Sequence, residues 1–205
     1  FIEWMKKYPQ VIQMGNQQRS SVESIDVMAQ IHAGAIGEVY QATAFYNNRR
    51  GRVPNPQQVP VPSHLDWDLF QGPAPRRDFL DIVEDYNWHW FWHWGTAETG
   101  NNAAHELDVA RWALQVKYPE MAITNSGKFH FKDDGWTMYD TMDASFRFPG
   151  GGIIKWDGKS RNAYNTYGGG RGTVIYGTEG TVWVDRGGYK LYNRGGELIS
   201  ERLSG

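Results

Sequence analysis

The stretch "NWHWFWHWGTAETGNNAAHELDVARWAL", residues 87–114, combines aromatic, histidine, turn and helix signals. Tryptophan occupies every second position from Trp88 to Trp94. A period of two is typical of an extended segment, because successive side chains then point to opposite sides. We therefore predict that residues 87–94 form an extended aromatic wall that leads into a turn.

Two histidines of this wall have a spacing that also occurs in metal sites. His89 and His93 are four residues apart, like two ligands on one face of a helix. In an extended segment they would instead lie about 13 Å apart, at roughly 3.3 Å per residue, whereas zinc ligands lie about 2 Å from the metal. The extended interpretation therefore predicts no metal site, and it predicts a packed or hydrogen-bonded side chain for His89.

The second half of the stretch predicts a turn followed by a helix. Residues 95–100 read "GTAETG", and Asn101 or Asn102 is a favourable N-cap. We expect an apolar stripe of the helix to face the core. This stripe consists of Ala103, Leu107, Ala110 and Leu114.

His105 lies off that stripe, in the first turn of the predicted helix. The positive end of the helix dipole disfavours an imidazolium there, and a neutral imidazole can exchange a proton with a substrate hydroxyl. Asp108 shares its face and either orients the ring or pairs with Arg111. A structural role for His105 remains the alternative, since a histidine in a first turn is more often structural.

The composition excludes several classes of function. A chain of 205 residues is long enough for one large domain with its own core. The absence of cysteine excludes disulfides, cysteine zinc sites and thiol nucleophiles. The net charge of −2 gives no signal for nucleic acid or an anionic membrane surface, and no apolar run reaches the roughly 18 residues of a membrane helix. We therefore expect neither nucleic acid nor a membrane as partner.

The rest of the chain predicts one more helix and a sheet. Ser20 and Glu23 fit a capping box before a helix that ends near Gly34. Residues 47–78 hold six of the nine prolines and predict a long loop. Strands are predicted at residues 11–15, 38–46, 122–131, 136–148, 151–159, 172–177, 180–185 and 189–193. These elements predict an α+β fold, with an open, mostly antiparallel sheet and helices packed on one face.

Four ordered motifs resemble the Gfo/Idh/MocA (glucose–fructose oxidoreductase / inositol dehydrogenase) family. They are "RSSVESIDVMAQIHAGAIGEVYQA", "HLDWDLFQGPAP", "FWHWGTAETGNNAAHELDVARWAL" and "IYGTEGTVWVD". The resemblance implies that residues 16–205 form the C-terminal domain of such an enzyme, with the glyceraldehyde-3-phosphate dehydrogenase-like fold. In the family this domain binds a sugar or polyol and makes the oligomer contacts, so a homo-oligomer through the sheet is expected.

The resemblance also implies that part of the enzyme lies outside this chain. Residues 1–15 are similar to the last helix and strand of an N-terminal Rossmann domain, which in the family binds NAD(P) and supplies a lysine from a Glu-Lys-Pro motif. This chain has no Glu-Lys-Pro and no G-x-G-x-x-G between a strand and a helix. We therefore expect NAD(P) as the cofactor of the full-length protein and none in this chain alone.

The family pattern assigns roles to individual residues. His105 matches the catalytic histidine, and Asn101 matches the position of an aspartate. An asparagine hydrogen-bonds a hydroxyl but does not act as a general base. Tyr46, Asn47 and Asn48 match a region that contacts substrate hydroxyls, although a polar strand end explains them equally well.

Further substrate-binding candidates come from neighbouring positions. They are His93, just before the turn, Asp108 on the helix, and Arg77 at the end of the proline-rich loop, for which a solvated arginine is the alternative. We predict the substrate-binding half of an NAD(P)-dependent oxidoreductase of a sugar or polyol, with His105 as proton relay. The alternatives are an NAD-dependent glycoside hydrolase of the same family and a non-catalytic carbohydrate-binding or oligomerisation module. In the latter, residues 11–15 pair with a neighbouring chain or are poorly ordered.

Overall fold

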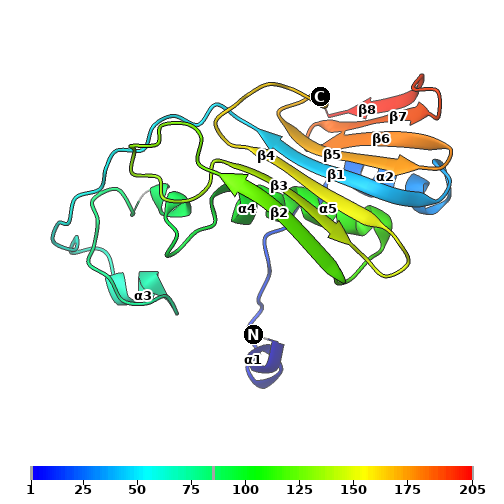
Figure 1. Cartoon of the computed structure of the whole chain (residues 1–205). Helices are drawn as coiled ribbons and strands as arrows, with labels where there is room; N and C mark the ends of the chain where they lie inside the picture. Colours follow the sequence, from blue (N-terminus) through cyan, green and yellow to red (C-terminus); the bar gives the residue numbers. More distant parts are fainter. Residues whose placement is uncertain (1, 85, 205) are drawn as a thin grey trace.

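An eight-stranded sheet forms the centre of the computed structural model, which describes residues 2–84 and 86–204 (Figure 1). The strand order is β2-β3-β4-β1-β5-β6-β7-β8. Only β1 and β4 pair in parallel among the described strands. The strands are β1 (Val39–Asn47), β2 (Met121–Gly127), β3 (Thr141–Arg147), β4 (Ile153–Lys159), β5 (Arg171–Gly177), β6 (Gly180–Asp185), β7 (Gly188–Asn193) and β8 (Leu198–Leu203).

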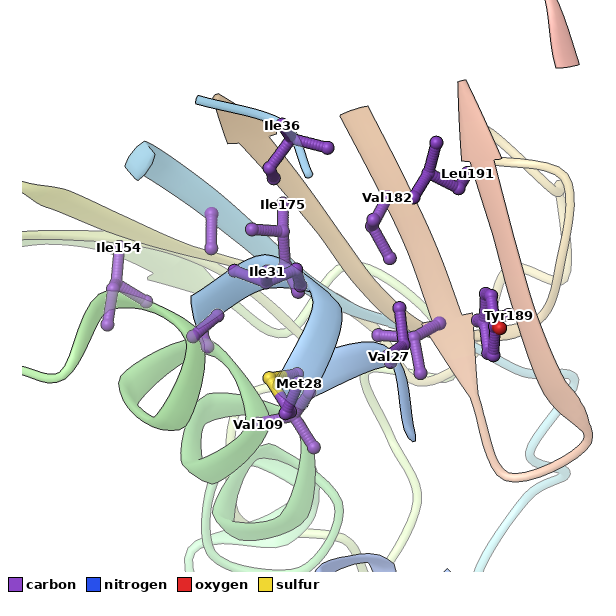
Figure 2. Close-up of a cluster of buried hydrophobic side chains, with 14 of the residues drawn as sticks. Val27, Met28, Ile31, Ile36, Val109, Ile154, Ile175, Val182, Tyr189 and Leu191 are labelled. Carbon is purple, nitrogen blue, oxygen red and sulfur yellow. The ribbon is translucent and has the colours of Figure 1, made fainter. Parts of the chain in front are cut away.

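Two helices cover one face of this sheet, α2 (Val22–His32) and α5 (Ala103–Leu114) (Figure 1). Their apolar side chains pack against alternate residues of the strands, such as Ile175 and Val182 (Figure 2). Each fully buried side chain of this size contributes about 1.5–3 kcal/mol. The predicted α+β fold, with helices on one face of a mostly antiparallel sheet, is confirmed.

Five shorter helices among the described residues lie outside the layer of α2 and α5. They are α1 (Ile2–Lys7), α3 (Trp67–Gln71) and α4 (Ala97–Gly100), with the 3-10 helices η1 (Gln17–Ser20) and η2 (Asn87–Trp90). Of these, η1 and α4 contact the helices of that layer. None of the helices in the described part of the chain has the length and apolar character of a membrane span.

The start of α2 differs from the prediction by one residue. Ser21, not Ser20, is the N-cap, and its Oγ accepts a hydrogen bond from the backbone N–H of Ser24. The hydroxyl of Ser21 donates to the Glu23 carboxylate at 2.9 Å. Ser20 instead ends η1, because two adjacent serines offer the same capping chemistry and the preceding 3-10 helix uses the first.

The predicted extended wall at residues 87–94 is wrong. The segment forms η2 and then a turn, in which the Trp94 N–H and the Gly95 N–H both donate to the Phe91 carbonyl. A Cβ on Gly95 would lie 2.4 Å from the His89 carbonyl oxygen, so glycine permits this close return of the chain. The argument that His89 and His93 lie too far apart for a common metal therefore loses its basis.

Residues 11–15 do not form the predicted strand. No described strand lies beside them, and a strand needs a partner for its backbone hydrogen bonds. Val11 is 98% exposed and Met14 is 80% exposed. The helix before them, α1, buries none of its residues and lies apart from the sheet (Figure 1).

The C-terminal edge of the sheet contains a strand that the sequence did not indicate. All six residues of β8 are exposed, so no buried face produces an alternating pattern. The predicted strands at 122–131 and 136–148 are too long, because residues 128–140 form a loop between β2 and β3. Asp140 holds this loop by accepting the N–H groups of Phe129 and His130.

Candidate functional site

A cavity of about 860 Å³ lies between one face of α5 and the aromatic segment before it. Residues 14–16 form a further part of its wall. The side chains that the family pattern singled out on α5 and its preceding turn gather here. They are Asn101, His105 and Asp108, and His93 also lines the cavity.

The helix period explains the grouping of His105 and Asp108, which are three residues apart and lie above one another on one face of α5. Asn101 precedes the helix, at the C-cap of α4, and the turn between α4 and α5 brings it to the same cavity. Ala104 and Arg111 complete the face. The cap before the helix is Asn102, but its side chain makes no capping hydrogen bond and donates to Glu98 instead.

The imidazole of His105 is partly buried at the cavity wall. Burial lowers the pKa of His105, and the cationic side chains of Arg186 and Arg171 lower it further, against an opposite contribution from Asp108. An imidazole with a lowered pKa is neutral at pH 7 and accepts a proton through its free nitrogen.

Asp108 has a different partner from either of those expected. Its carboxylate receives two hydrogen bonds from Arg19, at 2.7 and 2.9 Å. Arg111 donates instead to the Lys117 carbonyl. Arg19 comes from η1, far away in the sequence, so spacing along the helix gave no signal for this pair. Asp108 therefore joins η1 to α5 at the cavity wall.

Asn101 is held by a group of polar side chains beneath the turn. Its Nδ2 donates to Glu98 Oε2 at 3.2 Å and to the Tyr86 hydroxyl at 3.0 Å. Arg50 donates to Glu98 Oε1 at 2.8 Å and packs over the ring of Trp90, 5.0 Å from its centroid. Sequence reasoning missed this group, because Arg50 and Tyr86 lie in segments without regular secondary structure.

The three polar residues at the end of β1 do not line the cavity. Tyr46 is buried, and its hydroxyl accepts hydrogen bonds from Asn48 and from Arg50, the latter at 3.3 Å. Asn47 is buried as well, and its side chain has no hydrogen-bond partner among the described residues. Their direct contact with a substrate stays a prediction.

His93 lines both the main cavity and a second one of about 520 Å³. Arg77 lines the second cavity and not the first. Burial lowers the pKa of His93, and the charge of Arg77 lowers it further. The structure thus places His93 at the candidate site and Arg77 behind it.

All three carboxylates of the turn and helix are paired with an arginine. Glu98 pairs with Arg50, Asp108 with Arg19, and Glu106 with Arg171. Glu106 is completely buried against the sheet, a position that the predicted apolar stripe did not include. A buried charge needs a partner, and Arg171 from β5 supplies it.

Two arrangements typical of metal and dinucleotide sites are absent from the described residues. No three of their His, Asp and Glu side chains gather as metal ligands would. Neither of the two parallel strands of the described sheet leads through a glycine-rich turn into a helix, which is the arrangement that holds a dinucleotide diphosphate.

Comparison with known proteins finds the same fold in solved oxidoreductases. The aldose-aldose oxidoreductase from Caulobacter crescentus, complexed with glycerol, superposes with a TM-score of 0.67 at 14% identity over 99% of this chain and 50% of its own. An inositol dehydrogenase homolog from Azotobacter vinelandii, complexed with NADH and myo-inositol, has a TM-score of 0.65 at 12% identity over 98% and 45%. A levoglucosan dehydrogenase in complex with NADH and L-sorbose has a TM-score of 0.61 at 15% identity over 98% and 48%.

At the level of sequence, no protein-family model and no curated protein matches. The chain spans about half the length of the solved structures that it matches. At identities of 10–15% the likeness concerns the fold. The structural neighbours are oxidoreductases of the Gfo/Idh/MocA type, and the fold of this chain is that of their C-terminal domain.

Proposed function

We propose that this chain is the substrate-binding half of an NAD(P)-dependent oxidoreductase that acts on a hydroxyl of a sugar or polyol. The observation that carries the proposal is the cavity beside α5, where Asn101 and His105 meet a wall of aromatic side chains. Polar side chains at one wall bind hydroxyls, and indole rings pack against the apolar faces of sugar rings. Three structural neighbours are complexes with glycerol, myo-inositol and L-sorbose, which supports a sugar or polyol as ligand.

His105 is the residue that moves a proton in this proposal. Oxidation of an alcohol releases the proton of the hydroxyl, and the acceptor must be within hydrogen-bond reach. The lowered pKa of His105 keeps its ring neutral at pH 7 and ready to accept this proton. The carboxylate of Asp108 is held by two hydrogen bonds from Arg19 and is not assigned a proton-transfer role.

The cofactor is expected from residues outside this chain. Several structural neighbours are complexes with NADH or NAD+, and the chain spans about half their length. The proposed role of this chain is therefore to bind and orient the polyol and to hold the proton at His105.

We propose a homo-oligomer through the open face of the sheet, where Tyr176, Trp183 and Tyr192 line a shallow hollow of about 340 Å³.

The pairing of the carboxylates disfavours a hydrolase that works without a cofactor. Such an enzyme needs one carboxylic acid and one carboxylate at the scissile bond. Glu98, Glu106 and Asp108 are each paired with an arginine. An NAD-dependent glycosidase remains the second candidate, because it would use the same cavity and the same proton relay.

Isothermal titration of the 205-residue chain with glycerol, myo-inositol and L-sorbose tests the proposal. We expect binding of at least one polyol, and its loss in a His105→Ala variant, because the ring forms part of the cavity wall. A His64→Ala variant is the matched control, since His64 is exposed and pairs with Glu84 outside the cavity. Absence of binding for all three polyols, or equal effects of the two substitutions, would contradict the proposal.

A further inference from the structure

The side chain of Glu98 lies beneath Asn101 and is almost inaccessible to solvent, with 2% of it exposed. Its Oε1 accepts a hydrogen bond from Arg50, and its Oε2 accepts hydrogen bonds from Asn101 and Asn102. A buried carboxylate with a guanidinium partner at 2.8 Å is ionised. An ionised carboxylate accepts hydrogen bonds and donates none.

This chemistry fixes the direction of the Asn101 side-chain amide. The atom that faces Glu98 must be the nitrogen, because an oxygen there would meet an acceptor without a proton between them. The same nitrogen donates its other proton to the Tyr86 hydroxyl at 3.0 Å. Both donors of Asn101 are thus occupied within the protein.

The oxygen of the amide is left for the cavity. Asn101 lines the cavity, and its Oδ1 accepts no hydrogen bond from any residue that the structure describes. We infer that Glu98 is a positioning residue, which holds Asn101 so that this side chain presents only an acceptor to the ligand. The inference rests on the proposed polyol function and adds a rule of specificity. The ligand group opposite Asn101 must be a hydroxyl that donates its proton, whereas a carbonyl, ether or fluorine is rejected there.

The same geometry explains why an asparagine suits this position. An aspartate at position 101 would place a second carboxylate about 3 Å from that of Glu98, and two like charges at this distance raise the pKa of one of them. An Asn101→Asp variant should then be stable at low pH, where the raised group is protonated, and should lose stability as the pH rises through that raised pKa. A Glu98→Gln/Asn101→Asp double variant removes one of the two charges and should abolish this loss.

NMR spectroscopy of the ligand-free chain tests the positioning directly. In a Glu98→Gln variant, the side-chain amide resonances of Asn101 should shift, because the carboxylate that fixes them is gone. Glu106→Gln is the matched control, since Glu106 is also buried and paired with an arginine but has no contact with Asn101. A Tyr86→Phe variant, which loses only the hydroxyl, should shift one of the two amide protons.

Titration with myo-inositol supplies the second readout. Glu98→Gln should weaken binding by about tenfold, as expected for one hydrogen bond, and Glu106→Gln should not. Equal responses of the Asn101 resonances to both glutamine variants, or no response to Tyr86→Phe, would overturn the positioning role. So would unchanged affinity of Glu98→Gln in a chain that binds myo-inositol. If the unsubstituted chain binds no polyol, the proposed function fails, while the resonances still decide the role of Glu98.

Discussion

Replacing Arg161 should destabilise the fold more than any exposed arginine. Its side chain is fully buried, and Nη2 donates to Asp134, of which 1% is exposed. The guanidinium also lies 4.3 Å from the ring centroid of Trp136 and near the buried carboxylate of Asp140. An Arg161→Ala substitution removes the guanidinium from both buried carboxylates and leaves Lys128 as the remaining cationic partner of Asp134.

Breaking a buried ion pair on one side costs about 3–5 kcal/mol. For a domain of this size, 1 kcal/mol shifts the melting temperature by about 2–4 °C, so the expected decrease is roughly 6–20 °C. Arg147→Ala is the matched control, since its pair with Glu120 is about half exposed on both sides and contributes about 1 kcal/mol or less. Urea unfolding followed by tryptophan fluorescence measures both variants, and a loss for Arg161→Ala no larger than that for Arg147→Ala would refute the reasoning.

Three further predictions concern the site and the chain terminus. Removing one nearby positive charge with Arg186→Gln should raise the pKa of His105 in an NMR titration. The pKa of His105 is lower in the folded than in the unfolded protein. Its contribution to the free energy of unfolding is therefore largest above the unfolded pKa of about 6.5 and decreases as the pH falls below that value. Gly95→Ala should lower the melting temperature, because the new Cβ would lie 2.4 Å from the backbone carbonyl oxygen of His89. Gly51→Ala is the control, since a Cβ there meets open space and should change the free energy of unfolding by less than about 0.5 kcal/mol. Trypsin should cleave after Lys7 well before the sheet is degraded, and the truncated chain should keep its melting temperature, because α1 buries no residue.

The fold was predictable where side chains alternate between core and solvent. In β6, for example, Val182 and Val184 are buried and their neighbours are not, so the strand is visible in the sequence. The edge strand β8 has no buried face and therefore no pattern. The segment around Trp90 did alternate, yet it forms a short helix and a turn, because close packing of Trp90 on Trp136 replaces pairing with a strand.

The site was predictable only where it depends on a single helix. The spacing of His105 and Asp108 places them on one face of α5 whatever surrounds them, and Asn101 joins them from the turn just before the helix. The residues that hold them come from distant parts of the chain: Arg19 pairs with Asp108, and Arg50 pairs with Glu98, which accepts a hydrogen bond from Asn101. Pairs between distant segments depend on tertiary packing, which local periodicity does not report.

The position of β1 in the middle of the sheet delays its completion during synthesis. Both of its neighbours come late, because Asn47 pairs with Lys159, about 110 residues downstream, and Tyr46 pairs with Arg171. At a translation rate of about 5–20 residues per second, this strand waits roughly 6–25 s for its partners after it leaves the ribosome. Until then the segment "ATAFY", which is buried in the folded protein, has unpaired backbone groups that other strands can pair with. Ribosome-associated chaperones should therefore have a larger influence on the yield of this protein than on a chain whose central strand pairs with its next neighbour.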